Sequence, residues 1–303
     1  MEGQLTIFEK QQEKATPKIV NIASVPQRSP FRYPGGKTWL IPLVRKWLKP
    51  IYLTNQQAIQ KGSRAKKLIE PFAGGGIVSL TAAFENLADT VLMVELDHEV
   101  AAVWEVIING DHKWLADTIF SFDLTSENAA SILQKEEKTI REQAFGTILK
   151  NRIFHGGIIT KGSGLIKKGE NGKGIKSRWY PKTLHDRIMA LGHVKSKMKF
   201  VSGDAFVELE KVKNEAGTFS FIDPPYTIAG KRLYTHYQID NDALFELTSK
   251  LKGKFMMTYD DTDEIRDLVK KYAFDFRTIP MKTTHHVRKN EIIISDNFNW
   301  WRS

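Results

Sequence analysis

The chain has 303 residues, a formal net charge of +10 and no cysteine. The absence of cysteine excludes disulfides, thiolate metal sites and a cysteine nucleophile, and it fits a reducing cytoplasm. No apolar run reaches the length of a transmembrane helix, and the polar N-terminus lacks the apolar region of a signal peptide, so we expect no membrane association. So basic a chain makes nucleic acid the expected partner, with a merely solubilising surface as the alternative.

The first part of the chain contains an arm and a nucleotide-binding pattern. Residues 1–28 show no clear period, so we expect an arm that is partly disordered. Apolar residues at helical spacing predict a helix over 39–48. A strand, a glycine turn, a helix, a buried parallel strand and a second helix then follow at 68–72, 73–76, 77–87, 91–97 and 99–108. This order is typical of a nucleotide-binding βαβ unit.

The alternation of strands and helices fades in the middle of the chain and then resumes. We expect an inserted, mostly helical domain at 111–198, with helices near 112–120, 126–135, 137–151 and 182–191 and a basic hairpin at 152–178. Later strands are predicted at 199–201, 218–222, 254–259 and 291–295, with helices at 241–251 and 263–272. The catalytic domain would therefore consist of residues 29–110 and 199–303.

The glycine loop Phe72-Ala73-Gly74-Gly75-Gly76 lets the backbone approach a ligand closely and places a helix N-terminus beside it, although a plain tight turn would look similar. No Gly-Lys-Ser/Thr sequence follows, which excludes a P-loop. The spacing also differs from the G-x-G-x-x-G of dinucleotide-binding proteins. An adenosine-bearing cofactor without phosphates fits these features better.

Acidic residues follow two of the predicted strands. Glu95 and Asp97 end the second strand, where a carboxylate can accept both hydroxyls of a ribose, whereas Asp97 can alternatively cap the next helix. Asp204, in Gly203-Asp204-Ala205-Phe206, can accept from an adenine amino group or cap a helix. The sequence leaves these alternatives open.

The strand at 218–222 stops at Asp223-Pro224-Pro225-Tyr226, because proline cannot donate to a sheet ladder. Asp223 and a backbone carbonyl can accept hydrogen bonds from an amino group, and Tyr226 can stack on the ring that carries it. We therefore expect a site for a planar, amino-substituted ring at this strand end.

Two further stretches carry candidate contacts. Tyr33 and Lys37 flank a Pro-Gly-Gly turn and could hold a zwitterionic amino-acid group, although a turn that starts a helix explains this stretch better when it is taken alone. The segment 152–178 places cations on glycine-rich backbone, which suits contacts to DNA phosphates, with an exposed hairpin loop as the alternative. The cations that we expect to contact DNA are Arg152, Lys161, Lys167, Lys168, Lys173, Lys176 and Arg178. The histidines show no metal-ligand spacing, so no metal site is expected.

Taken in this order, the motifs resemble the Dam-like adenine-specific DNA methyltransferases. The resemblance rests on Tyr33-Pro34-Gly35-Gly36-Lys37, on Glu70 to Gly76, on Glu95, on Asp204 and on Asp223-Pro224-Pro225-Tyr226. The segment from Asn151 to Pro181 is similar to the family's recognition hairpin. Glu95 stands where the family more often has Asp, and the nearby Asp97 makes the ribose-binding position ambiguous.

The resemblance implies an α/β fold with a Rossmann-like mixed sheet of seven strands and an inserted recognition domain. It implies methyl transfer from S-adenosyl-L-methionine to N6 of an adenine flipped out of double-stranded DNA, in a cytoplasm of bacterial or phage-like type. The implied catalytic residues are Asp223, Pro224, Pro225 and Tyr226. The implied cofactor-binding residues are Tyr33, Lys37, Pro71, Phe72, Ala73, Gly74, Gly76, Glu95, Asp97, Asp204, Ala205 and Asp223.

Three alternatives remain from the residues alone. The tetrapeptide also suits the amine of cytosine, so an N4-cytosine methyltransferase is one of them. The others are an RNA adenine methyltransferase and a non-enzymatic nucleic-acid-binding module. A cognate restriction endonuclease is a candidate partner that the sequence does not reveal, and neither the target DNA sequence nor the oligomeric state can be read from it.

Overall fold

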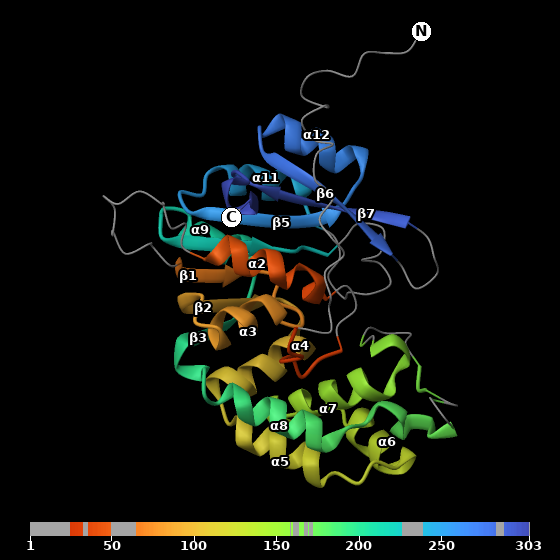
Figure 1. Ribbon diagram of the computed structural model, residues 1–303. Helices are drawn as coiled ribbons and strands as arrows, with labels where there is room; N and C mark the ends of the chain where they lie inside the picture. The colour runs from red at the N-terminus through yellow and green to blue at the C-terminus, as the bar shows by residue number, and fades with distance from the viewer. Residues whose placement is uncertain are drawn as a thin grey trace.

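The computed structural model describes residues 25–32, 36–49, 65–157, 159, 164–166, 169, 172–225, 239–282 and 288–302. Within them a central sheet carries helices on both faces, and a further group of helices lies beside one end of the sheet (Figure 1). The predictions at Tyr33, Lys161, Lys167, Lys168 and Tyr226 lie outside the described residues. No helix in the described part of the chain is long and apolar enough to span a membrane.

The sheet has seven strands in the order β3-β2-β1-β4-β5-β7-β6. Neighbours from β3 to β5 are parallel, whereas β7 is antiparallel to both β5 and β6. The strands are β1 (Ala65–Glu70), β2 (Ala88–Glu95), β3 (Met198–Ser202), β4 (Thr218–Ile222), β5 (Lys254–Asp260), β6 (Asp275–Lys282) and β7 (Arg288–Ser295). This topology confirms the expected Rossmann-like mixed sheet of seven strands.

Strand β6 is the one that the sequence analysis did not predict. It is an edge strand that pairs with β7 alone, and it contains Pro280. Proline is tolerated at an edge because its missing N–H can face away from the ladder. The signal is weak because half-buried edge strands lack the continuous apolar run that marks the central ones.

Apolar side chains fill the space on both faces of the sheet. One core cluster joins the strands to α2 (Ile41–Leu48), α3 (Ile77–Phe84) and α4 (His98–Trp104), and it includes the fully buried Trp47 and Trp104. The cluster on the other face joins them to α9 (Ala205–Val212), α11 (Asn241–Ser249) and α12 (Asp263–Lys271). Strands covered on both faces need continuous apolar sequence, which is why β4 is buried at every position.

The inserted region is mostly helical, as expected. Its helices are α5 (His112–Ser121), α6 (Ser126–Gln134), α7 (Ile140–Ile153) and α8 (Pro181–Leu191), which gather at the bottom of Figure 1. Buried side chains of α5, α7 and α8 belong to the same core cluster as α3 and α4. The inserted helices therefore share a continuous core with the sheet.

Short helical turns complete the described structure. They are η2 (Lys37–Leu40), the π-helical turn η3 (Glu105–Asn109), η4 (His155–Gly157), η6 (Gly174–Arg178), η7 (Lys195–Lys197) and η8 (Asn299–Arg302). Within the expected hairpin 152–178, Phe154 pairs with Leu165 in an isolated antiparallel bridge. The Ile166 N–H donates to the Ile153 carbonyl at 2.8 Å beside it. The described pairing is thus confined to the base of the hairpin.

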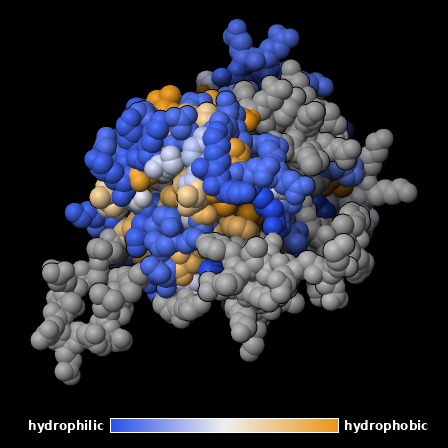
Figure 2. All heavy atoms as spheres, turned by 90° about the horizontal axis from the view of Figure 1, so that it is seen from above, coloured by the Kyte–Doolittle hydropathy of each residue, from blue (hydrophilic) through white to orange (hydrophobic). Residues whose placement is uncertain are grey.

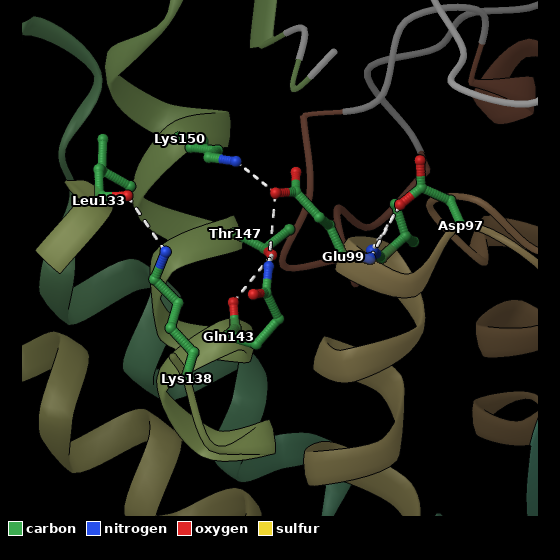
Figure 3. A network of polar contacts seen from close by, with 8 residues as sticks. Asp97, Glu99, Leu133, Lys138, Gln143, Thr147 and Lys150 are labelled. Atoms are coloured by element: carbon green, nitrogen blue, oxygen red, sulfur yellow. Dashed lines mark hydrogen bonds and ion pairs between the residues drawn. The ribbon is translucent and has the colours of Figure 1, made fainter. Parts of the chain in front are cut away.

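A polar network ties the inserted helix α7 to α4 (Figure 3). Asp97 caps α4 by accepting from the Glu99 and Val100 N–H groups at 2.9 and 3.3 Å. The Glu99 carboxylate then accepts from Lys150 and, at 3.4 Å, from Gln143, both on α7. The turn after β2 is thereby linked to helix α7.

The surface agrees with the charged composition. Over the described part of the face drawn in Figure 2, hydrophilic side chains predominate, and smaller apolar areas lie between them. Scattered apolar exposure of this kind is normal for a folded protein.

Gly76 offers a direct test of the turn between β1 and α3. Its φ of +64° lies in the left-handed region, and an added Cβ would lie 2.6 Å from Met93 Cε and 3.0 Å from the Trp104 ring. Gly76→Ala should therefore lower the free energy of unfolding by about 2–4 kcal/mol, measured by urea denaturation.

Gly146→Ala is the matched control. Gly146 lies inside α7, and an added Cβ would meet nothing closer than 3.9 Å, so this variant should be more stable than the parent by about 0.5–1 kcal/mol. Equal effects of the two substitutions would contradict the account of the turn.

Candidate active site

The parallel strands bring acidic side chains to one edge of the sheet. Glu70 and Glu95 end β1 and β2, Asp223 directly follows β4, and Asp204 lies two residues after the end of β3. All four line one cavity of about 620 Å³. Strand order reverses between β1 and β4, and the crevice at such a switch point is where open α/β sheets bind ligands.

The glycine loop forms the floor of this cavity. The Trp104 Nε1–H donates to the Gly74 carbonyl at 2.8 Å, and the Ser29 hydroxyl donates to the Gly75 carbonyl at 2.6 Å. The Ala73 N–H donates to the Val94 carbonyl at 2.9 Å, which pins the loop to β2. The predicted loop residues Pro71, Phe72, Ala73, Gly74 and Gly76 all line the cavity.

Glu70 is a buried acid at the switch point. It is 3% exposed and accepts from the Ser79 N–H at 2.8 Å. Burial raises the pKa of Glu70 to about 8, against the hydrogen bonds from Ser79 that lower it, with a smaller contribution from the Asp223 charge. The group is therefore largely protonated at neutral pH and ionises readily if a cation comes close.

Glu95 braces the turn on the other side of the loop. It accepts from the Gly74 N–H at 2.8 Å and from the Asp97 N–H at 2.9 Å. Burial raises the pKa of Glu95 to about 7, although these hydrogen bonds oppose the rise. Asp97 lines the same cavity but caps α4, so the structure realises the helix-cap alternative for Asp97.

Asp204, like Asp97, both caps a helix and lines the cavity. It caps α9 by accepting from the Phe206 and Val207 N–H groups at 2.7 and 3.2 Å, which realises the cap alternative. Asp204 and Ala205 also line the cavity, together with the apolar side chains of Phe206 and Leu96. An apolar pair beside a carboxylate suits a flat heterocycle with a polar edge.

Asp223 is held by two partners on one oxygen. Its Oδ1 lies 3.0 Å from Lys37 Nζ and accepts from the Thr258 hydroxyl at 2.7 Å. The Lys37 side chain is only 4% exposed, so this ion pair is largely shielded from water. Lys37, predicted to hold an amino-acid group, thus contacts the predicted catalytic carboxylate directly.

The prolines that follow Asp223 differ in exposure. Pro224 is buried, whereas Pro225 is half-buried and lines the cavity. Stiff backbone at the end of β4 therefore presents the Asp223 carboxylate to the cavity, as the sequence predicted for this motif.

The described basic residues of 152–178 do not lie together. Lys173 and Lys176 are exposed and Arg178 is half-buried, all on or beside η6. Arg152 is 4% exposed, donates to the Pro30 carbonyl and lines the cavity. The structure therefore places Arg152 in the buried last turn of α7 rather than on the hairpin, because that turn is packed under residues 29–32. Its contact with DNA stays a prediction.

Three residues of the site escaped the sequence analysis. Glu70 opens the glycine-loop motif but was given no role of its own, although an acid that ends an apolar strand is a readable signal. Thr258 was not readable, because its place beside Asp223 follows from the register in which β4 pairs Ile222 with Met257 of β5, and the sequence does not give that register. Asn151 was not readable either, because nothing in the sequence shows that its amide clamps Arg32 and Gly157 with hydrogen bonds of 2.8–2.9 Å.

The donor set indicates which ligands fit. Five carboxyl groups line the cavity, those of Glu70, Glu95, Asp97, Asp204 and Asp223. Acidic groups of this density disfavour a phosphate-bearing cofactor at the strand ends and favour a ligand that carries positive charge. The glycine loop, meanwhile, leaves room for a ligand to approach the backbone.

Comparison with known proteins supports the same conclusion. Residues 167–287 match the family model of the D12 class N6 adenine-specific DNA methyltransferases. This match confirms the resemblance seen in the motifs and identifies a DNA adenine methyltransferase domain, and hence an enzyme, in this part of the chain. The matched segment contains Asp204 and Asp223, whereas the glycine loop and Glu95 precede it.

Similarity to solved structures is weak. A proposed RNA methyltransferase from Pyrococcus horikoshii is 13% identical, with a TM-score of 0.37, and the alignment covers 88% of this chain and 84% of that one. A precorrin 8W decarboxylase from Methanobacterium thermoautotrophicum is 10% identical, with a TM-score of 0.28 and coverage of 77% and 82%. No curated protein matches the chain.

The raised pKa of Glu70 has a consequence for stability. The folded state holds a proton on Glu70 between pH 4.5, the ordinary value, and about 8, so this group makes stability fall as pH rises through that window. Glu70→Gln keeps an acceptor for the Ser79 N–H but cannot ionise. Urea denaturation should show the variant and the parent alike near pH 4.5, and the variant more stable by a few kcal/mol above about pH 8.

The parent protein measured at the same pH values is the reference, and Glu95 should leave a residual slope in both. A Glu70→Gln variant that follows the parent curve at every pH would contradict the buried, protonated state of Glu70.

Proposed function

We propose that this protein transfers a methyl group from S-adenosylmethionine to N6 of an adenine in double-stranded DNA, at specific sites. The observation that carries the proposal is the shared cavity: Asp223, held by Lys37 and Thr258, lines the same cavity as the glycine loop and Glu95. An amine-accepting carboxylate and a nucleoside-binding edge in one cavity suit transfer between two bound ligands.

The chain's residues fit the cofactor in three respects. The glycine loop can receive the amino-acid tail, the Glu95 carboxylate retains lone pairs for ribose hydroxyls, and Asp204 with Phe206 and Leu96 suits an adenine ring. When bound, S-adenosylmethionine supplies a methyl group on a positively charged sulfur. The five carboxyl groups at the strand ends, which we call the acidic wall, suit that positive charge.

Asp223 would act on the amine that receives the methyl group. The lone pair of an exocyclic amine is delocalised into its ring, so the nitrogen is a poor nucleophile. Asp223 and the Pro224 carbonyl can accept the two amine hydrogens and favour a pyramidal nitrogen with its lone pair directed at the methyl carbon. Lys37 and Thr258 fix the carboxylate orientation, and this positioning can lower the barrier by several kcal/mol.

The protons in this step can be followed. As the N–C bond forms and the C–S bond breaks, the nitrogen becomes cationic and loses one of its two hydrogens as a proton. Asp223 is placed to accept that proton or to pass it to water, since it already accepts a hydrogen bond from the amine. A base in a duplex cannot reach the cavity, so the adenine would be flipped out, and Tyr226 remains our candidate for stacking on it.

DNA binding would use the inserted domain. Lys173 and Lys176 are exposed on and beside the short turn η6, which ends at the half-buried Arg178, and these cations can neutralise phosphates. Tyr180, 51% exposed two residues later, lines the cavity and connects this surface to the site. The arrangement supports backbone contacts that position the duplex beside the cavity.

Asp223→Asn tests the catalytic role. The amide is nearly isosteric but neutral, so methyl transfer to DNA should fall about 10²–10³-fold or more in kcat. Thr258→Val, which removes one hydrogen bond, should cost about tenfold. Cofactor affinity, measured by calorimetry, should change little in either variant.

Thr90→Val is the matched control, because Thr90 is an exposed strand residue far along β2 from the carboxyl edge. Its kcat should equal that of the parent. Full turnover by the Asp223→Asn protein would exclude the mechanism.

The acidic wall predicts how cofactor affinity depends on pH. Glu70 and Glu95, with pKa values of about 8 and 7, ionise as pH rises, and only their ionised forms attract a sulfonium. The affinity for S-adenosylmethionine relative to S-adenosylhomocysteine, which lacks the charge, should therefore rise between about pH 6 and pH 9. Calorimetric titration with both ligands measures the ratio.

Glu70→Gln together with Glu95→Gln should flatten this rise while S-adenosylhomocysteine still binds. A ratio independent of pH in the parent protein would show that the two groups do not face the sulfur.

The basic turn predicts the salt dependence of DNA binding. Replacing Lys173 and Lys176 by Gln should weaken binding to duplex DNA and reduce the slope of log K against log salt by about 0.9 for each phosphate that is no longer neutralised. Lys250→Gln is the control, because this exposed lysine at the end of α11 pairs with Glu246. An unchanged slope in the double variant would remove this turn from the interface.

A further inference from the structure

Two arginines, from helices α7 and α8, line the same cavity as the five carboxyl groups. Arg152 lies in the last turn of α7 and Arg187 lies in α8, and both line the cavity wall. Arg152 donates to the Pro30 carbonyl, and Arg187 Nη1 donates to the Ser29 carbonyl at 3.2 Å. Each guanidinium thus uses one backbone carbonyl and keeps most of its five N–H donors for other partners.

Their charges are not balanced within the described chain. Arg152 is 4% exposed, and its Nε is buried without a hydrogen-bond partner. Burial, and then the nearby charges of Arg187 and Arg32, lower the pKa of Arg152 to about 9. Neither Arg152 nor Arg187 forms an ion pair with a described carboxylate, although buried charges are normally paired.

Neighbouring groups shape this corner for a ligand. The Asn151 amide fixes the backbone of Arg32 and Gly157, and Gly156 and Gly157 carry no side chains that would fill the wall. Tyr180 adds a phenol to the same wall. The corner is therefore a preformed, cationic pocket with unused donors, and its wall is fixed by hydrogen bonds.

We propose that Arg152 and Arg187 form an oxyanion site that binds one anionic group of a ligand in this cavity. The planar guanidinium matches the two oxygens of a carboxylate or a phosphate. Binding would give the unpaired Nε a partner and neutralise two neighbouring positive charges. The inference rests on the proposed function only for the identity of the ligand, not for the site itself.

Two ligands of the proposed reaction carry such a group. The cofactor's carboxylate is one, because Arg187 bonds to Ser29, whose hydroxyl bonds to the glycine loop. A phosphate next to the flipped adenine is the other, because Tyr180 joins the corner to the basic turn. If the arginines bind the cofactor carboxylate, their loss should change cofactor affinity. If they bind a DNA phosphate, their loss should change the salt dependence of DNA binding.

The experiment uses the full chain with Arg152→Gln, Arg187→Gln and the control Arg141→Gln. Arg141 lies at the opposite end of α7 from Arg152 and is half exposed. One arm measures affinity for S-adenosylmethionine and for its decarboxylated form. The other arm measures the salt slope of binding to duplex DNA.

If the cofactor carboxylate is the ligand, the parent should prefer S-adenosylmethionine to the decarboxylated form by about tenfold or more, and either variant should lose this preference. If a DNA phosphate is the ligand, the variants should lose about 0.9 of the salt slope. The Arg141→Gln protein should match the parent in both arms. Should Arg152→Gln not fold, Arg187→Gln alone decides.

Variants that keep both the carboxylate preference and the salt slope of the parent would overturn the oxyanion site. If the parent itself binds neither the cofactor nor DNA, the proposed function fails instead, and the two failures are therefore distinguishable. If the parent binds the cofactor and DNA and the arginine variants bind them in the same way, only the oxyanion site is contradicted.

Discussion

The site depends on the ion pair between Lys37 and Asp223. It connects the turn that precedes α2 to the end of β4, two segments 186 positions apart in the chain. The pair is largely shielded from water and shares its carboxylate oxygen with Thr258 of the neighbouring strand. Breaking a shielded pair leaves an uncompensated charge, so each partner constrains the position of the other. The Asp223 carboxylate is consequently placed by three elements at once.

The same edge of the sheet gathers five carboxyl groups around one cavity, and their charges would repel one another if all were ionised. Burial raises the pKa of Glu70 to about 8 and that of Glu95 to about 7, so both groups are less ionised at neutral pH than ordinary carboxyl groups. A bound cation would favour the ionised forms of these two carboxyl groups and so increase the negative charge of the wall. The corner formed by Arg152 and Arg187 complements this wall, because its guanidinium groups suit an anionic group whereas the carboxyl groups of the wall suit a positive one. A ligand with a positive centre and an anionic group elsewhere would satisfy both.

Much of this arrangement could be predicted from the sequence. Continuous apolar runs marked the central strands, and the acids that end them marked the carboxyl edge, since parallel strands must bring their ends together. Less could be predicted about partners. That Lys37 contacts Asp223 depends on the path of the chain over the sheet, which no local pattern encodes. Asp97 and Asp204 carry both a cap signal and a ligand signal, and the structure shows the cap without excluding the ligand.

Arg152 illustrates the limit most clearly. In a glycine- and lysine-rich segment its sequence context is that of a surface cation, yet it ends a helix whose last turn is buried under residues 29–32. Burial of a polar side chain by a distant segment is a tertiary effect, and composition carries no trace of it. The edge strand β6 was missed for the related reason that its packing, rather than its own apolar pattern, makes it a strand.

The central claim is that the Asp223 site methylates the exocyclic amine of adenine in DNA. The most direct test is to incubate the protein with duplex DNA and S-adenosylmethionine carrying a labelled methyl group, digest the DNA to nucleosides and identify the labelled product. The account predicts label in N6-methyladenine, and none when matched RNA replaces the DNA. Label in N4-methylcytosine, or label in RNA alone, would contradict it.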